Sequence, residues 1–291
     1  MSKRLYGTGV ALITPFNDDF SIDYHALKKL LEYTSENGAD YLVVHGTTGE
    51  PATTTLEEKI SILEFVKKNN TQNLPIVLGL GGNNTAEITN LFSAFDFNGI
   101  DAILSVGPYY NKPSQEGYFR HYWEIADKSP VPVILYNVPG RTGSNISSST
   151  VARLSQHGNI IGIKEASGDL VQCMEIRKNS KAGFVLIAGD DLLTLPMISF
   201  GAIGSISVLA NLYPKIYSEA IHLALDNKFA EGFEKLKLLL ELNPLLYKEG
   251  NPVGAKVVLA EKKLIQNNLR LPLHKASIAL ESEIKDAIKN I

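Results

Sequence analysis

Residues 160–169 read IIGIKEASGD, an apolar run that ends in a lysine and then becomes polar. Such a continuous run is typical of a parallel strand that is buried on both faces. Comparable short apolar runs recur along the chain and alternate with longer amphipathic segments. The strands that these runs predict are Val10–Thr14, Tyr41–His45, Ile76–Gly79, Ala102–Val106, Val133–Tyr136, Ile160–Lys164, Phe184–Ala188 and Gly204–Val208.

The segments between these runs have the periodicity of helices, and several of them end at Gly or Asn. The pairs Asn37-Gly38, Asn98-Gly99 and His157-Gly158 are predicted helix C-caps. Eight strand–helix units within about 225 residues predict a (β/α)8 barrel, a TIM barrel, whose usual size is roughly 250 residues. An open doubly wound sheet is the alternative, but its early Gly-rich nucleotide turn is absent here. The helices predicted between the first strands are Tyr24–Asn37, Leu56–Asn69, Thr85–Phe97 and Glu116–Lys128.

After Leu209 the pattern becomes purely helical. We interpret the first of these helices as the last one of the barrel and the others as an addition to it. The sequence therefore predicts a catalytic barrel domain at residues 1–226 and a C-terminal helical extension at 227–291. No low-complexity linker separates the two, so we expect the extension to pack on the barrel. The predicted helices are Lys215–Asp226, Phe229–Leu242, Pro252–Lys262 and Leu273–Lys289.

Composition excludes several classes of protein. The 291 residues include 28 basic and 31 acidic side chains, with a formal net charge of -3 and no long block of either sign. We therefore expect no nucleic acid and no membrane as partners. Cys173 is the only cysteine, which excludes an internal disulfide, and we interpret it as a small buried apolar residue. The first five residues lack the apolar run of a secretion signal, so we predict a cytoplasmic protein.

Lys164 is the most informative residue, because functional side chains of such barrels lie where the strands end. A buried ammonium there is costly unless it is paired, and burial or neighbouring cations favour the neutral amine. A neutral amine can attack a keto group and form an imine. The alternatives are a lysine paired with a buried carboxylate and a lysine that anchors a phosphate, and position alone does not decide among the three.

Other strand ends carry further candidates. The phenol of Tyr136 could transfer protons with Thr47 as a relay, although a structural tyrosine with a satisfied hydroxyl is the alternative. Arg141 lies in a loop bounded by Gly and Pro and suits a bidentate contact with a carboxylate; a surface ion pair is the alternative. The loop that begins at Thr48 and Gly49 could hold a second, smaller carboxylate through its N–H groups.

Tyr109 and Tyr110 follow a Gly-Pro turn and are predicted to project from the mouth of the barrel. Exposed adjacent aromatic residues often mark an interface, and simple surface exposure is the alternative. His45 could face the interior of the barrel, where a lone histidine is more often structural. Asp190 and Asp191 suggest a metal only weakly, since no third ligand is evident.

Four motifs in order on four strand ends together resemble one known family. They are GTTGE at 46–50, PYYNKP at 108–113, YNVPGRTG at 136–143 and GIKEASGD at 162–169. The chain resembles the dihydrodipicolinate synthase family of the pyruvate-dependent class I aldolases, from Gly7 through the C-terminal helices. This resemblance implies a lyase of lysine and diaminopimelate biosynthesis that condenses pyruvate with L-aspartate-4-semialdehyde.

The resemblance also implies roles for individual residues. Lys164 would form the imine with pyruvate, which becomes an enamine and attacks the aldehyde. Tyr136 would donate and accept protons, relayed through Thr47 and through Tyr110 of a neighbouring subunit. Arg141 would bind the carboxylate of the aldehyde substrate.

Further features follow from the same resemblance. The backbone at Thr47 and Thr48 would bind the pyruvate carboxylate, and Gly189 and Ile206 would also belong to the substrate site. The resemblance implies no metal and no organic cofactor, only the covalent imine. It also implies a homotetramer, a dimer of dimers, with Tyr109 and Tyr110 at an interface.

Two other functions stay open on the sequence. One is a pyruvate aldolase for a sugar acid, similar to N-acetylneuraminate lyase. Such relatives tend to carry an apolar residue at the position of Arg141 and a Ser at that of Thr47, so both residues here favour the dipicolinate branch. Gly140 departs from the Ser that is common in this loop. The second is a non-catalytic barrel that binds a metabolite.

Family members that are inhibited by lysine resemble this chain at Asn83, Glu87 and Tyr109, a possible allosteric site. They often have histidines where this chain has Leu56 and Lys59. Glu87 would attract a lysine ligand, but Lys59 would repel it. We therefore expect weak or no inhibition by lysine.

Overall fold

Eight parallel strands in the order β1 to β8 form a closed barrel in the computed structural model, which describes residues 5–289 and 291. The predicted barrel is confirmed, and the open sheet is excluded. The prediction about a secretion signal rests largely on the first four residues, which lie outside the described part. The strands are β1 Gly7–Ala11, β2 Tyr41–Val44, β3 Ile76–Gly79, β4 Ala102–Val106, β5 Val133–Asn137, β6 Ile160–Glu165, β7 Val185–Ala188 and β8 Gly204–Ser207.

Helices follow the strands and continue beyond the last of them. Within the described residues, none is long and apolar enough to cross a membrane. Their bounds are α1 Tyr24–Glu36, α2 Leu56–Asn69, α3 Thr85–Leu91, α4 Gln115–Lys128, α5 Pro139–Thr142, α6 Ser148–Leu154, α7 Leu170–Asn179, α8 Thr194–Ser199, α9 Leu209–Leu212, α10 Pro214–Leu225, α11 Phe229–Leu236, α12 Leu242–Leu245, α13 Val253–Glu261 and α14 Ile278–Ile288, with 3₁₀ turns η2 Thr47–Gly49 and η3 Lys237–Leu239.

The chain divides into two compact units. One comprises Pro75–Ile206 together with the segment that ends at Tyr6, and the other comprises Gly7–Leu74 and Ser207–Ile291. The second unit therefore groups β1 and β2 with all the C-terminal helices. The division into a barrel domain at 1–226 and an extension at 227–291 uses a different boundary and stays a prediction.

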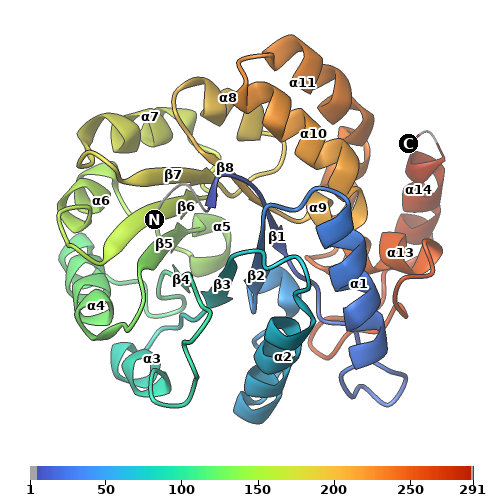
Figure 1. Ribbon diagram of the computed structural model, residues 1–291, viewed down its shortest axis with the longest axis horizontal. Helices are drawn as coiled ribbons and strands as arrows, with labels where there is room; N and C mark the ends of the chain where they lie inside the picture. Colours follow the sequence, from blue (N-terminus) through green and yellow to red (C-terminus); the bar gives the residue numbers. More distant parts are fainter. Residues whose placement is uncertain (1–4, 290) are drawn as a thin grey trace. The chain divides into compact units, whose positions relative to one another are not determined.

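In the first unit, strands β3 to β7 pair in sequence order, and helices α3, α4, α6 and α7 line their outer side (Figure 1). The strand residues are buried almost without interruption, as a sheet covered on both faces requires. Ser114 is the N-cap of α4, and its side chain accepts a hydrogen bond from the Gly117 N–H. It buries Tyr118, Tyr122 and Ile125 completely.

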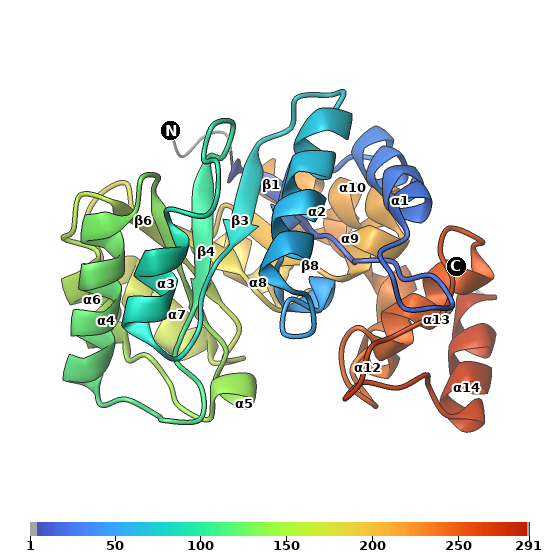
Figure 2. The ribbon, with the colours of Figure 1, turned by 90° about the horizontal axis from the view of Figure 1, so that it is seen from below.

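In the second unit, β1 pairs with β2, and α9 and α10 contact β1. Helix α2 begins with a capping box in which Thr55 and Glu58 satisfy each other's backbone N–H groups. Helix α13 packs on α9 and on α14, and α14 also contacts α12, so these helices form a group near the C-terminus (Figure 2). Contacts through α9 thus connect the C-terminal helices to the strand layer of this unit.

Several predicted helix ends are wrong. Asn37 does cap α1, but Asn98-Gly99 and His157-Gly158 lie beyond the ends of α3 and α6. Helix α3 stops at Leu91 because the following N–H groups bond three residues back, as in the bond from Ser93 to Asn90, instead of four. The helix predicted at Phe229–Leu242 is interrupted: α11 ends at Leu236, the 3₁₀ turn η3 follows it, and α12 begins only at Leu242.

Candidate active site

Lys164 and Tyr136 lie side by side near the ends of two paired strands. They are direct register partners of β6 and β5, and Lys164 Nζ is 4.4 Å from the centroid of the Tyr136 ring. Both residues are nearly buried, with exposed fractions of 7% and 6%. The structure thus places the predicted amine and phenol next to each other in a desolvated environment.

Lys164 has no ion-pair partner among residues 5–289 and 291. Glu165 is adjacent in sequence, but successive side chains of a strand point to opposite faces. Its carboxylate is instead engaged by Asn137, Ser167 and Gln172. This observation argues against the alternative of a lysine paired with a buried carboxylate.

A buried polar network lies on the other face of β5 and β6. Asn137 Nδ2 donates to both oxygens of Glu165 at 3.0 and 2.9 Å, and Gln172 Nε2 donates to Oε2 at 3.0 Å. Asn145 joins the network through a 2.7 Å bond from its Nδ2 to Gln172 Oε1. Burial raises the pKa of Glu165, whereas the hydrogen bonds from Asn137, Ser167 and Gln172 act in the opposite direction. The network ties β5 and β6 to α7 and to the loop after α5.

Arg141 lies in α5, a single helical turn where the sequence predicted a loop. The turn begins at Pro139 and ends at Gly143, whose positive φ of 73° suits glycine. Arg141 is exposed, and its guanidinium makes no ion pair or hydrogen bond within the described part of the chain. It is therefore available for a carboxylate ligand, and the alternative of a surface ion pair finds no partner there.

Tyr110 is the most exposed of the candidate residues, at 90%, and Tyr109 is exposed at 45%. Tyr110 has a φ of 69°, a conformation that is uncommon for a residue with a bulky side chain. Asn111 N–H bonds to the Tyr109 carbonyl at 2.8 Å and closes this turn. The rings do project from the loop after β4, as predicted.

Two of the three possible allosteric residues, all of which lie in the first unit, are joined by a hydrogen bond. Asn83 Nδ2 donates to the Tyr109 carbonyl at 3.2 Å, and Asn111 Nδ2 donates to the Asn83 carbonyl at 2.9 Å. Glu87 lies in the first turn of α3 and accepts a bond from Asn84 Nδ2 at 3.0 Å. The structure therefore brings Asn83 and Tyr109 together, with Glu87 four residues further along.

Thr47 and Thr48 open the 3₁₀ turn η2 in the second unit. The first N–H groups of a helical turn have no acceptor within the turn, so those of Thr47 and Thr48 can donate hydrogen bonds to a ligand. Thr48 is buried, and its Oγ1 accepts a 2.9 Å hydrogen bond from Asn251 Nδ2. Thr47 is only partly buried, and its hydroxyl makes no hydrogen bond within the described residues. No structural contact in the described chain therefore occupies this hydroxyl.

Comparison with known proteins identifies the family. A model of the dihydrodipicolinate synthetase family matches residues 4–291. The chain belongs to this family. The 4-hydroxy-tetrahydrodipicolinate synthase of Cytophaga hutchinsonii is 54% identical over 282 residues, which are 97% of this chain and 95% of the relative.

Solved structures of dihydrodipicolinate synthases share the whole fold. The chloride-inhibited enzyme of Acinetobacter baumannii in complex with pyruvate superposes with a TM-score of 0.95 at 36% identity, covering 98% of each chain. A structure described as the first monomeric dihydrodipicolinate synthase variant gives a TM-score of 0.95 at 32% identity, covering 99% of this chain and 97% of that one. The family resemblance is confirmed, and these relatives do not favour a sugar-acid lyase.

The structure explains the remaining polar candidates of this dihydrodipicolinate synthetase family member without assigning them to the site. His45 is directed to α2, where its Nε2 donates to the Lys59 carbonyl at 2.8 Å, so the idea that it faces the barrel interior is wrong. Asp190 caps its own loop by accepting a bond from the Leu192 N–H. The described residues hold no group of three or more His, Cys, Asp or Glu suited to a metal ion. Cys173 is buried, and burial raises the pKa of its thiol to about 12, as expected of an unreactive residue.

The remaining two predicted substrate residues lie in the first unit. The Gly189 N–H donates to the Glu165 carbonyl at 2.7 Å, and a Cβ at this position would be only 2.9 Å from the same oxygen. Glycine is therefore required for β7 to approach β6 at its end. Ile206 lies in β8 and is buried.

Sequence reasoning missed two sets of residues around the predicted site. Strand alternation could have indicated Asn137 and Glu165, because each follows a residue assigned to the opposite face. Nothing in the sequence indicated Asn251, which bonds to Thr48 across 203 positions, or Lys256, which pairs with Glu50. Contacts of this range arise only from the tertiary fold.

Proposed function

We propose that this protein is a class I pyruvate-dependent lyase that condenses pyruvate with L-aspartate-4-semialdehyde, the 4-hydroxy-tetrahydrodipicolinate synthase reaction of lysine and diaminopimelate biosynthesis. The observation that carries the proposal is the position of the Lys164 amine, buried against the Tyr136 ring and without a carboxylate partner in the described chain. The names of the curated relatives support the same activity.

In the proposed reaction, Lys164 Nζ attacks the keto carbon of pyruvate, and loss of water gives an imine. Removal of a methyl proton converts the imine to an enamine, whose carbon attacks the aldehyde carbon. The amino group of the aldehyde substrate then attacks the imine carbon, which closes the ring and releases Lys164. Tyr136 supplies and removes the protons of these steps, through Thr47 and through Tyr110 of a neighbouring subunit.

The two carboxylates are bound at separate places in this proposal. The N–H groups of Thr47 and Thr48 bind that of pyruvate, and Arg141 binds that of the aldehyde substrate. Gly189 and Ile206 complete the substrate site. The protonated imine itself withdraws electrons from the reacting carbon, so the proposal includes no metal and no organic cofactor.

The proposed relay needs more than one subunit, and we propose a homotetramer, a dimer of dimers, in the cytoplasm. The 90% exposure of Tyr110 in the single chain supports this assembly, because a neighbouring subunit would cover the ring. Sedimentation velocity of the purified protein tests the assembly directly. A monomeric protein with full activity would contradict the role of Tyr110.

Borohydride reduction in the presence of pyruvate tests the imine. Peptide mapping should place the reduced adduct on Lys164, and Lys164→Ala should abolish it. Turnover with L-aspartate-4-semialdehyde should exceed turnover with N-acetylmannosamine, the aldehyde of the sugar-acid alternative. Reversible binding of pyruvate without any trapped adduct would instead favour a non-catalytic metabolite-binding barrel.

A further inference from the structure

The turn Gly46–Glu50 ends in a buried ion pair. Glu50 has a φ of 53°, a left-handed conformation that is uncommon for a residue with a long side chain. Its Oε1 lies 2.6 Å from Lys256 Nζ of α13, and the two side chains are 2% and 0% exposed. The backbone at the end of the turn is thus fixed by a contact with the C-terminal part of the chain.

The ammonium of Lys256 is held from several sides. Besides Glu50, it donates to the Asn268 carbonyl at 2.8 Å and lies 4.2 Å from the centroid of the Phe16 ring. Burial lowers the pKa of Lys256 to about 8, although the Glu50 carboxylate acts in the opposite direction. Because desolvation offsets most of the attraction within a buried ion pair, such a pair is weak evidence for stabilisation. Its main effect here is on geometry.

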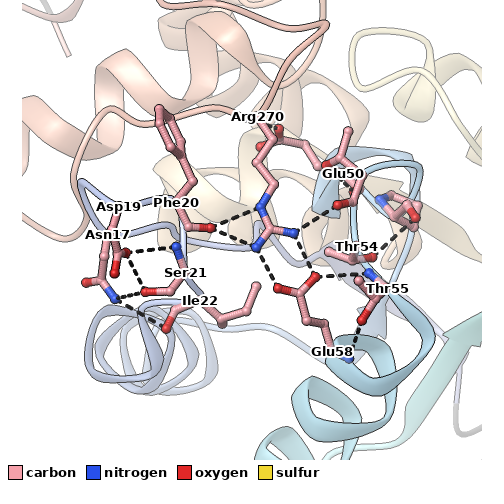
Figure 3. Close-up of polar contacts among 12 residues, drawn as sticks. Asn17, Asp19, Phe20, Ser21, Ile22, Glu50, Thr54, Thr55, Glu58 and Arg270 are labelled. Atoms are coloured by element: carbon pink, nitrogen blue, oxygen red, sulfur yellow. Dashed lines mark hydrogen bonds and ion pairs between the residues drawn. The ribbon is translucent and has the colours of Figure 1, made fainter.

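Arg270 fixes the chain that follows the turn (Figure 3). All five of its guanidinium N–H groups are used: it contacts Glu58 in a bidentate manner at 2.6 and 2.7 Å, the Phe20 carbonyl twice and the Thr53 carbonyl at 2.8 Å. Its backbone N–H also faces Glu50 Oε2 at 3.4 Å. The segment from Glu50 to the start of α2 is therefore tied to the same C-terminal loop as Lys256.

The middle of the turn has two further tethers. Asn251 Nδ2 donates to Thr48 Oγ1 at 2.9 Å, and Thr14 Oγ1 donates to the Gly49 carbonyl at 2.7 Å. A Cβ on Gly49 would lie 3.0 Å from the Leu12 carbonyl, so the turn sits close against the chain after β1. These contacts leave the Thr47 hydroxyl as the uncommitted polar side chain of the turn.

We propose that Glu50 and Lys256 form a positioning pair, through which helix α13 holds the Thr47–Thr48 turn in the shape that binds the pyruvate carboxylate. This inference rests on the proposed function, because it assigns pyruvate to that turn. A carboxylate bound by backbone N–H groups requires their directions to be fixed, and an error of about 1 Å can cost a large factor in productive binding. Neither residue contacts the substrate in this proposal.

The test compares Lys256→Met with the double variant Glu50→Gln, Lys256→Met. The single variant leaves a buried unpaired carboxylate and should lower Tm, whereas the double variant removes both charges and should recover Tm. In both variants, the pyruvate concentration that gives half-maximal borohydride trapping on Lys164 should rise about tenfold. The KM for the aldehyde should stay near that of the wild type.

Leu280→Ala is the matched control, since Leu280 is buried in α14, a helix that packs on α12 and α13. It should lower Tm through a cavity without changing the trapping curve for pyruvate. A folded double variant with the trapping curve of the wild type would overturn the inference, as would an equal shift in the control. If Lys256→Met does not fold, the double variant decides. No trapping in the wild type would instead contradict the proposed function itself.

Discussion

Tyr136 and Lys164 are register partners on β5 and β6, and the Lys164 amine lies 4.4 Å from the centroid of the Tyr136 ring. In a parallel pair, residues in register point to the same face, so this proximity follows from the strand pairing itself. Asn137 and Glu165 are register partners as well, and the hydrogen bond between their side chains links β5 to β6 on the opposite face. The amine and the phenol of the proposed site are thus carried by strands, which hold geometry better than loops do.

Tyr136→Phe should lower kcat by at least about 100-fold, because general acid–base catalysis typically contributes factors of this size. The substitution keeps the apolar part of the ring beside Lys164, so Tm should change little. Steady-state kinetics and thermal unfolding measure the two effects. A variant with nearly normal kcat would remove the phenol from the mechanism.

Arg141→Ala should raise the KM for the aldehyde about 10- to 100-fold, the value of lost charge-assisted hydrogen bonds. The KM for pyruvate and Tm should stay unchanged, because the side chain is exposed and has no partner in the part of the chain that the structure describes. Arg141→Lys should lie between the two, since it keeps the charge but not the bidentate geometry. An unchanged KM for the aldehyde in Arg141→Ala would show that the carboxylate binds elsewhere.

Glu165→Gln should lower the free energy of unfolding by about 1–3 kcal/mol. The amide NH₂ of the glutamine would face N–H groups that now donate hydrogen bonds to the carboxylate. Glu165 is 2% exposed and receives bonds from Asn137, Ser167 and Gln172. Glu175→Gln changes an exposed carboxylate of α7 outside this network and should cost less than about 0.5 kcal/mol. Urea unfolding compares them, and equal stabilities would contradict a structural role for the network.

Stability should fall between pH 6.5 and pH 4 partly because of His121. Burial lowers the pKa of His121 to about 4, so the fold keeps it neutral where the unfolded chain is protonated. The stability that depends on neutral His121 is fully present above pH 6.5 and is lost as the pH falls towards 4. The loss in the free energy of unfolding amounts to about 3 kcal/mol. The residue is 6% exposed, and its Nδ1 lies 2.8 Å from Thr85 Oγ1.

His121→Asn, which retains a polar atom near the position of Nδ1, should therefore show a shallower loss of stability across this pH range. The exposed His25→Asn serves as the control and should follow the wild type. Urea unfolding at several pH values between 4 and 7 provides the curves. Parallel curves for the wild type and His121→Asn would exclude this source of acid sensitivity.

The strand pattern of the barrel could be predicted well from the sequence, but strand bounds depend on the partner. β3 and β4 lie at the predicted residues, whereas β1 spans Gly7–Ala11 instead of Val10–Thr14. Its first residues are small, and a Cβ on Gly9 would collide with the Tyr41 ring of the paired strand. A glycine here makes room for a neighbour, which an apolar pattern does not reveal.

The sequence by itself determined that Lys164, Tyr136 and Arg141 lie where strands end, because the apolar runs that stop before them must be buried. It could not determine which carboxylates and ammonium groups meet. Glu165 is next to Lys164 in the chain yet points away from it, while Glu50 pairs with the distant Lys256. Side-chain pairing between distant residues is decided only when the elements pack. An unpaired buried charge is costly, so each charged group that becomes buried pairs with a group that the fold places within reach.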